Sequence, residues 1–185
     1  QLTVTADNQT VEYNKDIPNL TYKVAGFVNN ETQEGIGLTV NAPTTEATKG
    51  SPVGDYPITV SGDASTTNYT VQYVEGTLKI TDNTEGLSDL SATGINQPYT
   101  GEAQELLTGE ATTSLEGAKI QYSLDGEEYK DEIPTGTEAG TYTVYVKATA
   151  ANYAEKVIEV KAEITKVQLT VTADNQTVEY NKDIP

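Results

Sequence analysis

Residues 1–18 read QLTVTADNQTVEYNKDIP, and residues 168–185 repeat the same eighteen letters without a change. Within this stretch Leu2, Val4 and Ala6 alternate with threonines, which is the pattern of a β-strand with one buried face. The two copies lie 167 residues apart, and repetition at a fixed period indicates an array of structural units. The sequence therefore predicts a repeated unit that begins with a β-strand.

A second, weaker repeat lies inside this unit. One set of positions recurs at a spacing of 86 residues and another at 84, so two residues are deleted between the corresponding strands. The first set pairs Tyr13, Gly54 and Tyr56 with Tyr99, Gly140 and Tyr142, and the second pairs Asn68, Tyr69 and Thr81 with Asn152, Tyr153 and Thr165. We therefore predict two homologous modules, residues 1–81 and 82–166, with the start of the next repeat in residues 167–185. The polar, acidic stretch TDNTEGLSD at residues 81–89 is interpreted as their linker.

The composition favours thin β cores. Hydrophobic residues make up 36% of the 185 residues, below the ~45–50% of ordinary domains. The apolar set is Val, Ile and Leu with 12 Tyr, a single Phe and no Trp or Met, which suits a pleated, half-buried surface. We expect an all-β fold of two small tandem modules, with at most one short helical turn at residues 29–34, before Gly35.

Apolar alternation predicts strands in both modules. The runs are residues 2–6, 20–24, 56–60, 69–73 and 78–80 in the first module, and 120–124, 142–146 and 157–164 in the second. Asp125-Gly126 predicts a hairpin with a two-residue type I′ turn, and residues 74–77 are interpreted as a similar corner. Tyr56 and Tyr142 each follow a glycine by two residues at the start of a strand, which matches the tyrosine corner of immunoglobulin-like sandwiches.

Charge and apolar run length restrict the partners. The chain carries 28 acidic and 11 basic residues, a net charge of −17, which repels nucleic acid and anionic membrane surfaces. No apolar run approaches the ~20 residues that cross a bilayer, and residues 1–10 lack the basic start and apolar core of a signal peptide. We expect no nucleic-acid partner, no membrane insertion and a monomer.

The sequence offers little reactive chemistry. It contains no histidine and no cysteine, which removes the commonest general base, metal ligand and thiol nucleophile. We therefore expect no enzyme, and no catalytic, cofactor-binding or metal residues. The acidic cluster of residues 127–132 is interpreted as a solvated hairpin edge that discourages aggregation. Residues 82–89 could offer a few calcium ligands, and Lys23 or Lys79 could be imagined in an isopeptide cross-link with Asn68, but nothing singles out either possibility.

The sequence also resembles known families. The run LTVTADNQTVEYNKDIPNLTYKVAGFVNNET, with SPVGDYPITVSG and NYTVQYVEGTLKIT, resembles the MBG-type repeats of large bacterial extracellular proteins, which usually carry Tyr-Gly where this chain has Tyr13-Asn14. Residues 82–166, with QPYTGEAQELLTG, IQYSLDGEEY, IPTGTEAGTYTVYVKA and NYAE, resemble the bacterial Ig-like repeats found beside them. The resemblance implies Ig-like sandwiches, with a β-grasp-like alternative for the first module, in adhesin-like surface proteins.

Two functions from different classes follow from these patterns. The first is a stalk or spacer that projects the head of a bacterial adhesin, extracellular and on a Gram-positive cell wall, whose partners are the neighbouring repeats. The alternative is a repeat that binds a host glycan or protein and gains from avidity. For the copy at 168–185 we expect partial docking, with Leu169 and Val171 against the second module, because residues 165–168 are too short for a free hinge.

Overall fold

The computed structural model describes residues 1–181 and 183, and within them it is built of strands and turns without a helix. The first module contains β1 (Leu2–Ala6), β2 (Gln9–Glu12), β3 (Tyr22–Ala25), β4 (Gly54–Ile58), β5 (Val71–Val74) and β6 (Gly76–Thr81). The second contains β7 (Asn96–Pro98), β8 (Gln104–Glu105), β9 (Lys119–Ser123), β10 (Thr135–Gly136), β11 (Gly140–Ala150) and β12 (Tyr153–Thr165). The all-β prediction is confirmed.

A bent ribbon of parallel strands forms the spine of the first module. β1 pairs in parallel with β5, with Leu2 opposite Val71, and β2 pairs in parallel with β6, with Gln9 opposite Leu78. β3 adds to the other edge of β1 and β4 to the other edge of β6, which gives two three-stranded sheets of orders β3-β1-β5 and β2-β6-β4. The first and last strands of the module therefore lie side by side along its length.

The chain passes from one sheet to the other between β1 and β2, and again between β5 and β6, and these two crossings lie next to each other. The side chain of Asn8 accepts a hydrogen bond of 2.8 Å from the Thr77 amide at this bend. A Cβ on Gly76 would lie 2.6 Å from the carbonyl oxygen of Ala6, so only glycine permits this approach. β5 and β6 do not pair with each other, and the interpretation of residues 74–77 as a hairpin corner is therefore wrong.

Each module has its own core. The buried hydrophobic side chains of the first are Leu2, Val4, Ala6, Leu38, Ala47, Ile58, Val60, Tyr69, Leu78 and Ile80. Those of the second are Leu87, Leu90, Ile95, Leu106, Leu107, Ala111, Tyr122, Val144, Val146, Ala148, Ala162 and Ile164. The alternation predicted for β1 is confirmed, because its residues are buried at every second position. Full burial of each large side chain contributes about 1.5–3 kcal/mol.

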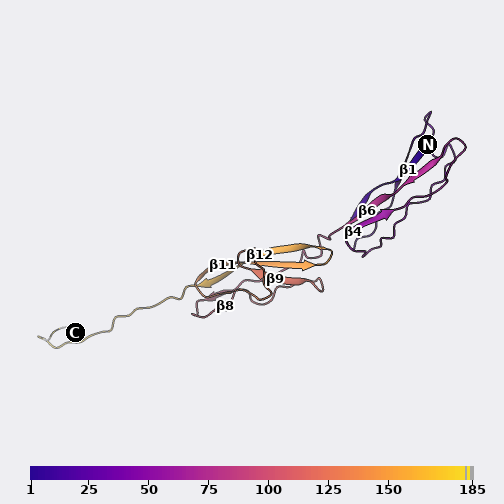
Figure 1. Ribbon diagram of the computed structural model, residues 1–185. Helices are drawn as coiled ribbons and strands as arrows, with labels where there is room; N and C mark the ends of the chain where they lie inside the picture. The colour runs from indigo at the N-terminus through magenta and orange to yellow at the C-terminus, as the bar shows by residue number, and fades with distance from the viewer. Residues whose placement is uncertain (182, 184–185) are drawn as a thin grey trace.

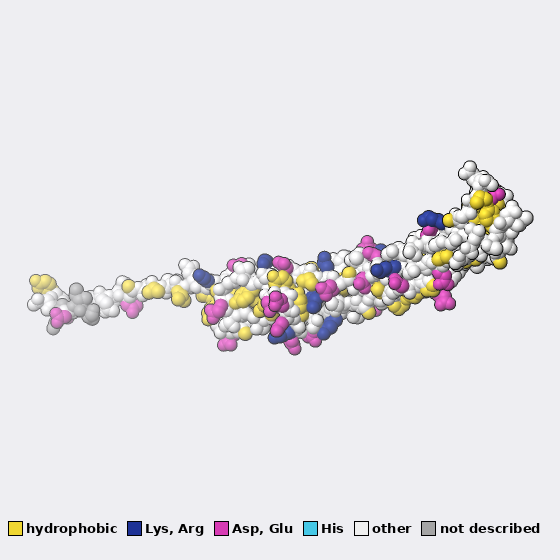
Figure 2. Space-filling model, turned by 45° about the horizontal axis from the view of Figure 1, so that its top comes forward, with side chains coloured by type: hydrophobic (Ala, Val, Ile, Leu, Met, Phe, Trp, Pro, Cys, Tyr) yellow, Lys and Arg dark blue, Asp and Glu magenta, His cyan; other side chains and the backbone are white. Residues whose placement is uncertain are grey.

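The long hairpin β11–β12 dominates the second module. It forms the centre of a four-stranded sheet of order β7-β12-β11-β9, and β8 and β10 form a small second sheet. β7 pairs in parallel with the end of β12, so here too an early strand of the module lies beside its last strand. Figure 1 shows the two modules end to end, and Figure 2 shows the elongated outline that results, with acidic side chains along it.

The hairpin after β9 forms, but its turn differs from the predicted one. Tyr122 pairs with Lys130, and of the two central residues only Gly126 has a positive φ, 77°. The carboxylate of Asp125 accepts hydrogen bonds from the amides of Glu127 and Glu128, at 2.8 and 3.0 Å. In an Asx-type turn of this kind the side chain gives nearby backbone amides a local hydrogen-bond partner. The hairpin is confirmed, and the type I′ turn is wrong.

The polar stretch after β3 forms turns. Asn29 and Asn30 have positive φ values of 53° and 56°, and the Ile36 amide donates to the carbonyl of Thr32 at 3.1 Å in a single turn. Positive φ values at two successive residues are incompatible with a right-handed helix. The described part of the first module therefore lacks the helix that would support the β-grasp-like alternative.

The C-terminal copy extends away from the second module. Leu169 and Val171 are 86% and 95% exposed, and none of residues 168–181 belongs to a strand. The prediction that these two side chains dock on the second module is therefore wrong. β12 ends at Thr165, and residues 166–181 form no strand.

Both predicted tyrosine corners are confirmed. The hydroxyl of Tyr56 donates to the carbonyl of Pro52 at 2.8 Å, and that of Tyr142 donates to the carbonyl of Glu138 at 2.7 Å. In each module the phenol thus bonds the backbone four residues upstream. This bond ties the loop before β4 or β11 to the strand that follows it.

Replacing either corner tyrosine by phenylalanine should lower the free energy of unfolding of its module by about 1 kcal/mol, because one hydrogen bond is lost and the ring is kept. Urea unfolding of Tyr56→Phe and Tyr142→Phe measures the change. Tyr180→Phe is the control. The ring of Tyr180 is fully exposed, so the loss of its hydroxyl should leave the free energy of unfolding unchanged. Equal stabilities of all three variants would contradict the role of the corners.

Candidate functional site

The joint between the modules is organised by one buried amide. Asn83 is 8% exposed, and its side-chain nitrogen donates to the carbonyl of Tyr13 at 2.8 Å. Its side-chain oxygen accepts from the amides of Glu85 and Gly86, each at 3.0 Å. Its backbone also pairs with the hairpin turn of the second module, accepting from Ala154 at 3.1 Å. One residue therefore bonds both modules.

Two tyrosine rings meet beside this amide. Tyr13 from the first module and Tyr153 from the second contact edge to face, with ring centroids 5.4 Å apart and an interplanar angle of 82°. Such pairs contribute about 0.5–1.5 kcal/mol beyond the area they bury. A Cβ on Gly86 would lie 2.3 Å from the ring of Tyr153, so the chain can pass this ring only as glycine.

Polar contacts surround the rings. Lys15 forms an ion pair with Glu85 across the joint, and this hydrogen bond lowers the pKa of Glu85 and raises that of Lys15. The side chain of Asn152 accepts from the Val53 amide at 2.9 Å, so a loop of the first module is also bonded to the second. The joint is thus a packed and hydrogen-bonded contact.

Residues 81–89 were interpreted as a polar linker, and Asn83 was not predicted to have a structural role. A usable signal was present, because Tyr13, Asn152 and Tyr153 were all recognised as repeat anchors. Polar character alone does not distinguish a solvated linker from a hydrogen-bonded one. The anchors near the module ends make matching contacts, since the amide of Tyr13 donates to Thr81 at 2.8 Å and that of Tyr99 donates to Thr165 at 2.9 Å.

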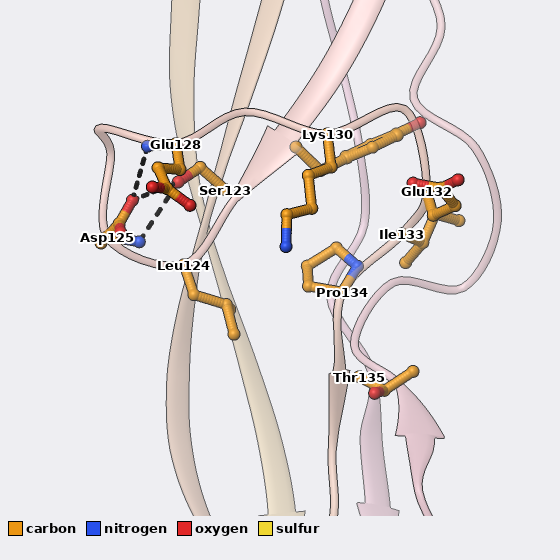
Figure 3. A pocket seen from close by; sticks show the side chains of 10 residues that line it. Ser123, Leu124, Asp125, Glu128, Lys130, Glu132, Ile133, Pro134 and Thr135 are labelled. Atoms are coloured by element: carbon orange, nitrogen blue, oxygen red, sulfur yellow. Dashed lines mark hydrogen bonds between the residues drawn. The ribbon is translucent and has the colours of Figure 1, made fainter.

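A hollow lies elsewhere, beside the hairpin loop of the second module. It has a volume of about 390 Å³, and Figure 3 shows Lys130 extending between Leu124 and Pro134. Its one aromatic residue, Tyr122, is 4% exposed and presents no ring for stacking on a sugar. Among the described residues this hollow therefore does not favour the glycan-binding alternative.

Two acidic residues of this loop, Asp125 and Asp131, are engaged locally. Asp131 pairs with Lys119 at 3.3 Å and accepts from Gln121 at 2.8 Å, and these hydrogen bonds lower its pKa. No group of three acidic, histidine or cysteine side chains that could hold a metal ion occurs in the described part of the chain. Asp125 is therefore held by the turn and Asp131 by the neighbouring strand β9.

The residues considered for an isopeptide cross-link are on the surface. The Lys23 side chain is 81% exposed and pairs with Asp7 at 2.9 Å. Lys79 and Asn68 are exposed as well. A buried arrangement of lysine, asparagine and carboxylate is not formed by these residues.

The described residues also contain no helix able to span a bilayer.

A family match covers the first module. Residues 2–79 match the MBG domain of the YGX type. The first module is an MBG domain. Asn14, which follows Tyr13, has a φ of 62°. This is the left-handed region where glycine is the default residue and asparagine is tolerated. The departure from Tyr-Gly in this MBG domain is therefore accommodated by its backbone.

Comparisons with other proteins add little to the MBG match. The solved structures include the human desmocollin-1 ectodomain (14% identity, 87% of this chain, 39% of that chain, TM-score 0.27) and the tandem Ig repeats of Dlar (12%, 90%, 98%, 0.30). A third is mouse cadherin-23 EC22–24 (12%, 89%, 67%, 0.29). The chain thus spans 39% of the desmocollin chain. No curated protein matches significantly. The MBG match indicates an extracellular repeat module.

Asn83→Ala should uncouple the MBG domain from the second module. The carbonyl of Tyr13 and two amides would lose their partner, at a cost of about 1–3 kcal/mol for the buried groups. We expect the two modules to tumble separately in NMR relaxation while each keeps its own fold. The control is Asn19→Ala at an exposed position of the MBG domain. Continued joint tumbling of the Asn83 variant would show that the amide does not hold the modules together.

The second module should lose stability in acid through Asp89 and Asp125. Hydrogen bonds from Thr113, the largest contribution, and from Ser114 lower the pKa of Asp89 from 3.8 to about 2. The pKa of Asp125 is likewise lowered to about 2, chiefly by the hydrogen bond with Ser123 and then by the amides of Glu127 and Glu128. Because the folded pKa values lie below the ordinary one, the stabilisation is present above pH 3.8 and is lost as the pH falls towards about 2.

Denaturant midpoints measured across this pH range test the expectation. In the double variant Asp89→Asn/Asp125→Asn each side chain keeps an acceptor but cannot titrate, so the acid-induced loss should be smaller than in the parent chain. An identical pH profile for both chains would contradict the assignment.

Proposed function

We propose that this chain is a stalk segment of a bacterial surface adhesin, on the Gram-positive cell wall, whose repeats project a functional head from the cell. The joint around Asn83 supports this proposal, because hydrogen bonds and a ring contact fix one module on the next. A spacer that holds a head at a distance needs such joints more than it needs a binding groove. The partners in this role are neighbouring repeats.

The observation that carries the proposal is the parallel pairing of terminal strands. Tension between the ends of the MBG domain pulls β1 and β6 in opposite directions along the ribbon. The four register pairs of β1–β5 and the four of β2–β6 are then loaded together in shear. Pairs that share a load resist more force than pairs that open one after another.

The second module follows the same design with fewer bonds. β7 and β12 share three parallel register pairs, and Asn83 forms a further parallel bridge with Tyr153. The first part of the second module therefore pairs with β12 at both ends of that strand, through Asn83 at Tyr153 and through β7 at residues 163–165. A passive role also agrees with the absence of histidine and cysteine from the sequence.

Single-molecule pulling tests the stalk proposal. Because the chain has no cysteine, introduced cysteines serve as unique handles. Handles at Gln1→Cys and Thr81→Cys load the ribbon in shear. Handles at Gln1→Cys and Thr70→Cys lie at one end of it, since the amide of Leu2 bonds the carbonyl of Thr70 at 2.8 Å, and they unzip the same bonds.

We expect the unfolding force of the MBG domain to be several-fold higher in shear than in unzipping. Unfolding under force is governed by the unfolding barrier, so equilibrium stability alone does not fix this result. We also expect the second module to unfold at a lower force than the MBG domain when the whole chain is stretched. Equal forces in the two pulling geometries would remove the mechanical support for a stalk.

A further inference from the structure

The internal repeat relates the joint between the modules to the C-terminal end of the second module. On the MBG side the joint uses the ring and carbonyl of Tyr13 and the amide of Val53. At the spacing of 86 residues these two correspond to Tyr99 and Ala139. The tyrosine corners keep the same spacing, because their acceptors are the carbonyls of residues 52 and 138. The second module therefore repeats the positions through which the MBG domain holds it.

The residue that bonds both modules also has a counterpart. At the spacing of 84 residues Asn83 corresponds to Val167. Tyr99, Ala139 and Val167 line one hollow of about 360 Å³, together with neighbouring residues of the same end. The counterparts of three joint residues are thus gathered in one place on the second module.

The strand register of the MBG domain indicates what lies opposite Val167 in the repeat that it precedes. Val167 stands directly before an identical copy of the first eighteen residues of the MBG unit. In the MBG domain β1 and β5 pair in parallel, with Leu2 opposite Val71. The same register, continued back by two positions, places the residue before the unit opposite Tyr69.

The observed joint contains the same pairing. Asn83 forms a parallel bridge with Tyr153, and its amide donates to the carbonyl of the preceding residue at 3.0 Å. At the spacing of 84 residues Tyr153 corresponds to Tyr69. The internal repeat and the strand register therefore give the same neighbour for Val167.

We propose that the end of the second module formed by Tyr99, Ala139 and Val167 is a docking surface for the MBG domain of the following repeat. The backbone of Val167 pairs there with that domain's counterpart of Tyr69, and Tyr99 takes the place that Tyr13 has in the first joint. This second joint deepens the stalk proposal, and it rests on that proposal only in taking a neighbouring repeat as the partner.

The second joint is apolar where the first is polar. Valine lacks the side-chain amide through which Asn83 forms three hydrogen bonds. The ion pair of Lys15 with Glu85 has no equivalent either. Its counterparts at the two spacings are Gly101 and Leu169, which carry no charge. A hydrogen-bonded joint and an apolar joint therefore alternate along the array.

The receiving side of the MBG domain offers an apolar partner. The ring of Tyr69 is 7% exposed and contacts Phe27 edge to face, with centroids 6.4 Å apart, so it is already covered. Val28 lies beside it, because the Val28 amide donates to the Tyr69 hydroxyl at 3.1 Å, and its own side chain is 57% exposed. We therefore expect Tyr99 to pack against the counterpart of Val28.

The chain extended by residues 19–81 tests the proposal, because residues 168–185 then continue into a complete second MBG domain. Independent motion is the default for tandem domains. With isotope labelling restricted to the added domain, we expect NMR relaxation to show that it tumbles as one body with the second module. The amide of Val167 should exchange with solvent more slowly than in the 185-residue chain, by on the order of tenfold, since it gains a backbone hydrogen bond.

Two variants of the extended chain separate the joints. Val167→Asp places a charge in the apolar joint and should release the added domain, while the first joint is retained. Asn83→Ala should release the first MBG domain and leave the added one docked. Val167→Ile is the matched control, since it keeps an apolar side chain and should change neither joint. Tyr99→Ser lies outside the added domain, and it should release that domain even if Val167→Asp unfolds it.

Either of two results would overturn the proposal. One is separate tumbling of the added domain in the extended parent chain, and the other is an equal exchange rate of the Val167 amide in the two chains. Neither result would change the pulling experiment, which loads strand pairs within the first MBG domain. The docking proposal and the stalk proposal can therefore fail separately.

Discussion

The structure depends on the parallel pairing that joins the first strand of the MBG domain to its last. β1 and β2 run beside β5 and β6 through both sheets, and the bend between sheets is fixed by Asn8 on one strand and Gly76 on the other. Because β1 is the central strand of its sheet, the core cannot close without it. The same pairing gives the terminal strands the parallel arrangement on which the proposed stalk function relies.

The joint connects the end of this ribbon to the second module. β2 ends at Glu12, and the following residue, Tyr13, contacts Tyr153 and gives its carbonyl to Asn83. The parallel ribbon of the MBG domain therefore ends at the contact with the second module, and in the proposed stalk the load passes through this contact. Asn14 accomplishes the turn at this point with the left-handed conformation that glycine usually provides.

Much of the fold could be predicted from the sequence, and the failures have physical causes. Period-two alternation located the main strands, and the glycine-tyrosine spacing located both tyrosine corners. Asp125-Gly126 was given the wrong turn, because the Asp125 carboxylate takes two backbone amides and competes with the two-residue turn. Asn83 was not identified as the joint residue, since its role depends on a hairpin turn that lies about seventy residues further along the chain, and the repeat anchors Tyr13 and Tyr153 marked only its surroundings.

The two identical copies, residues 1–18 and 168–185, show which features the local sequence determines and which depend on tertiary contacts. Asn14 and Asn181 have φ values of 62° and 65°, so the turn after the tyrosine is the same in both copies. It is set by local backbone preference. The strand is different, because residues 2–6 form β1 while the identical residues 169–173 belong to no strand. Alternation makes a segment able to be a strand, but only β3 and β5 supply the hydrogen-bond partners and the buried face that make it one.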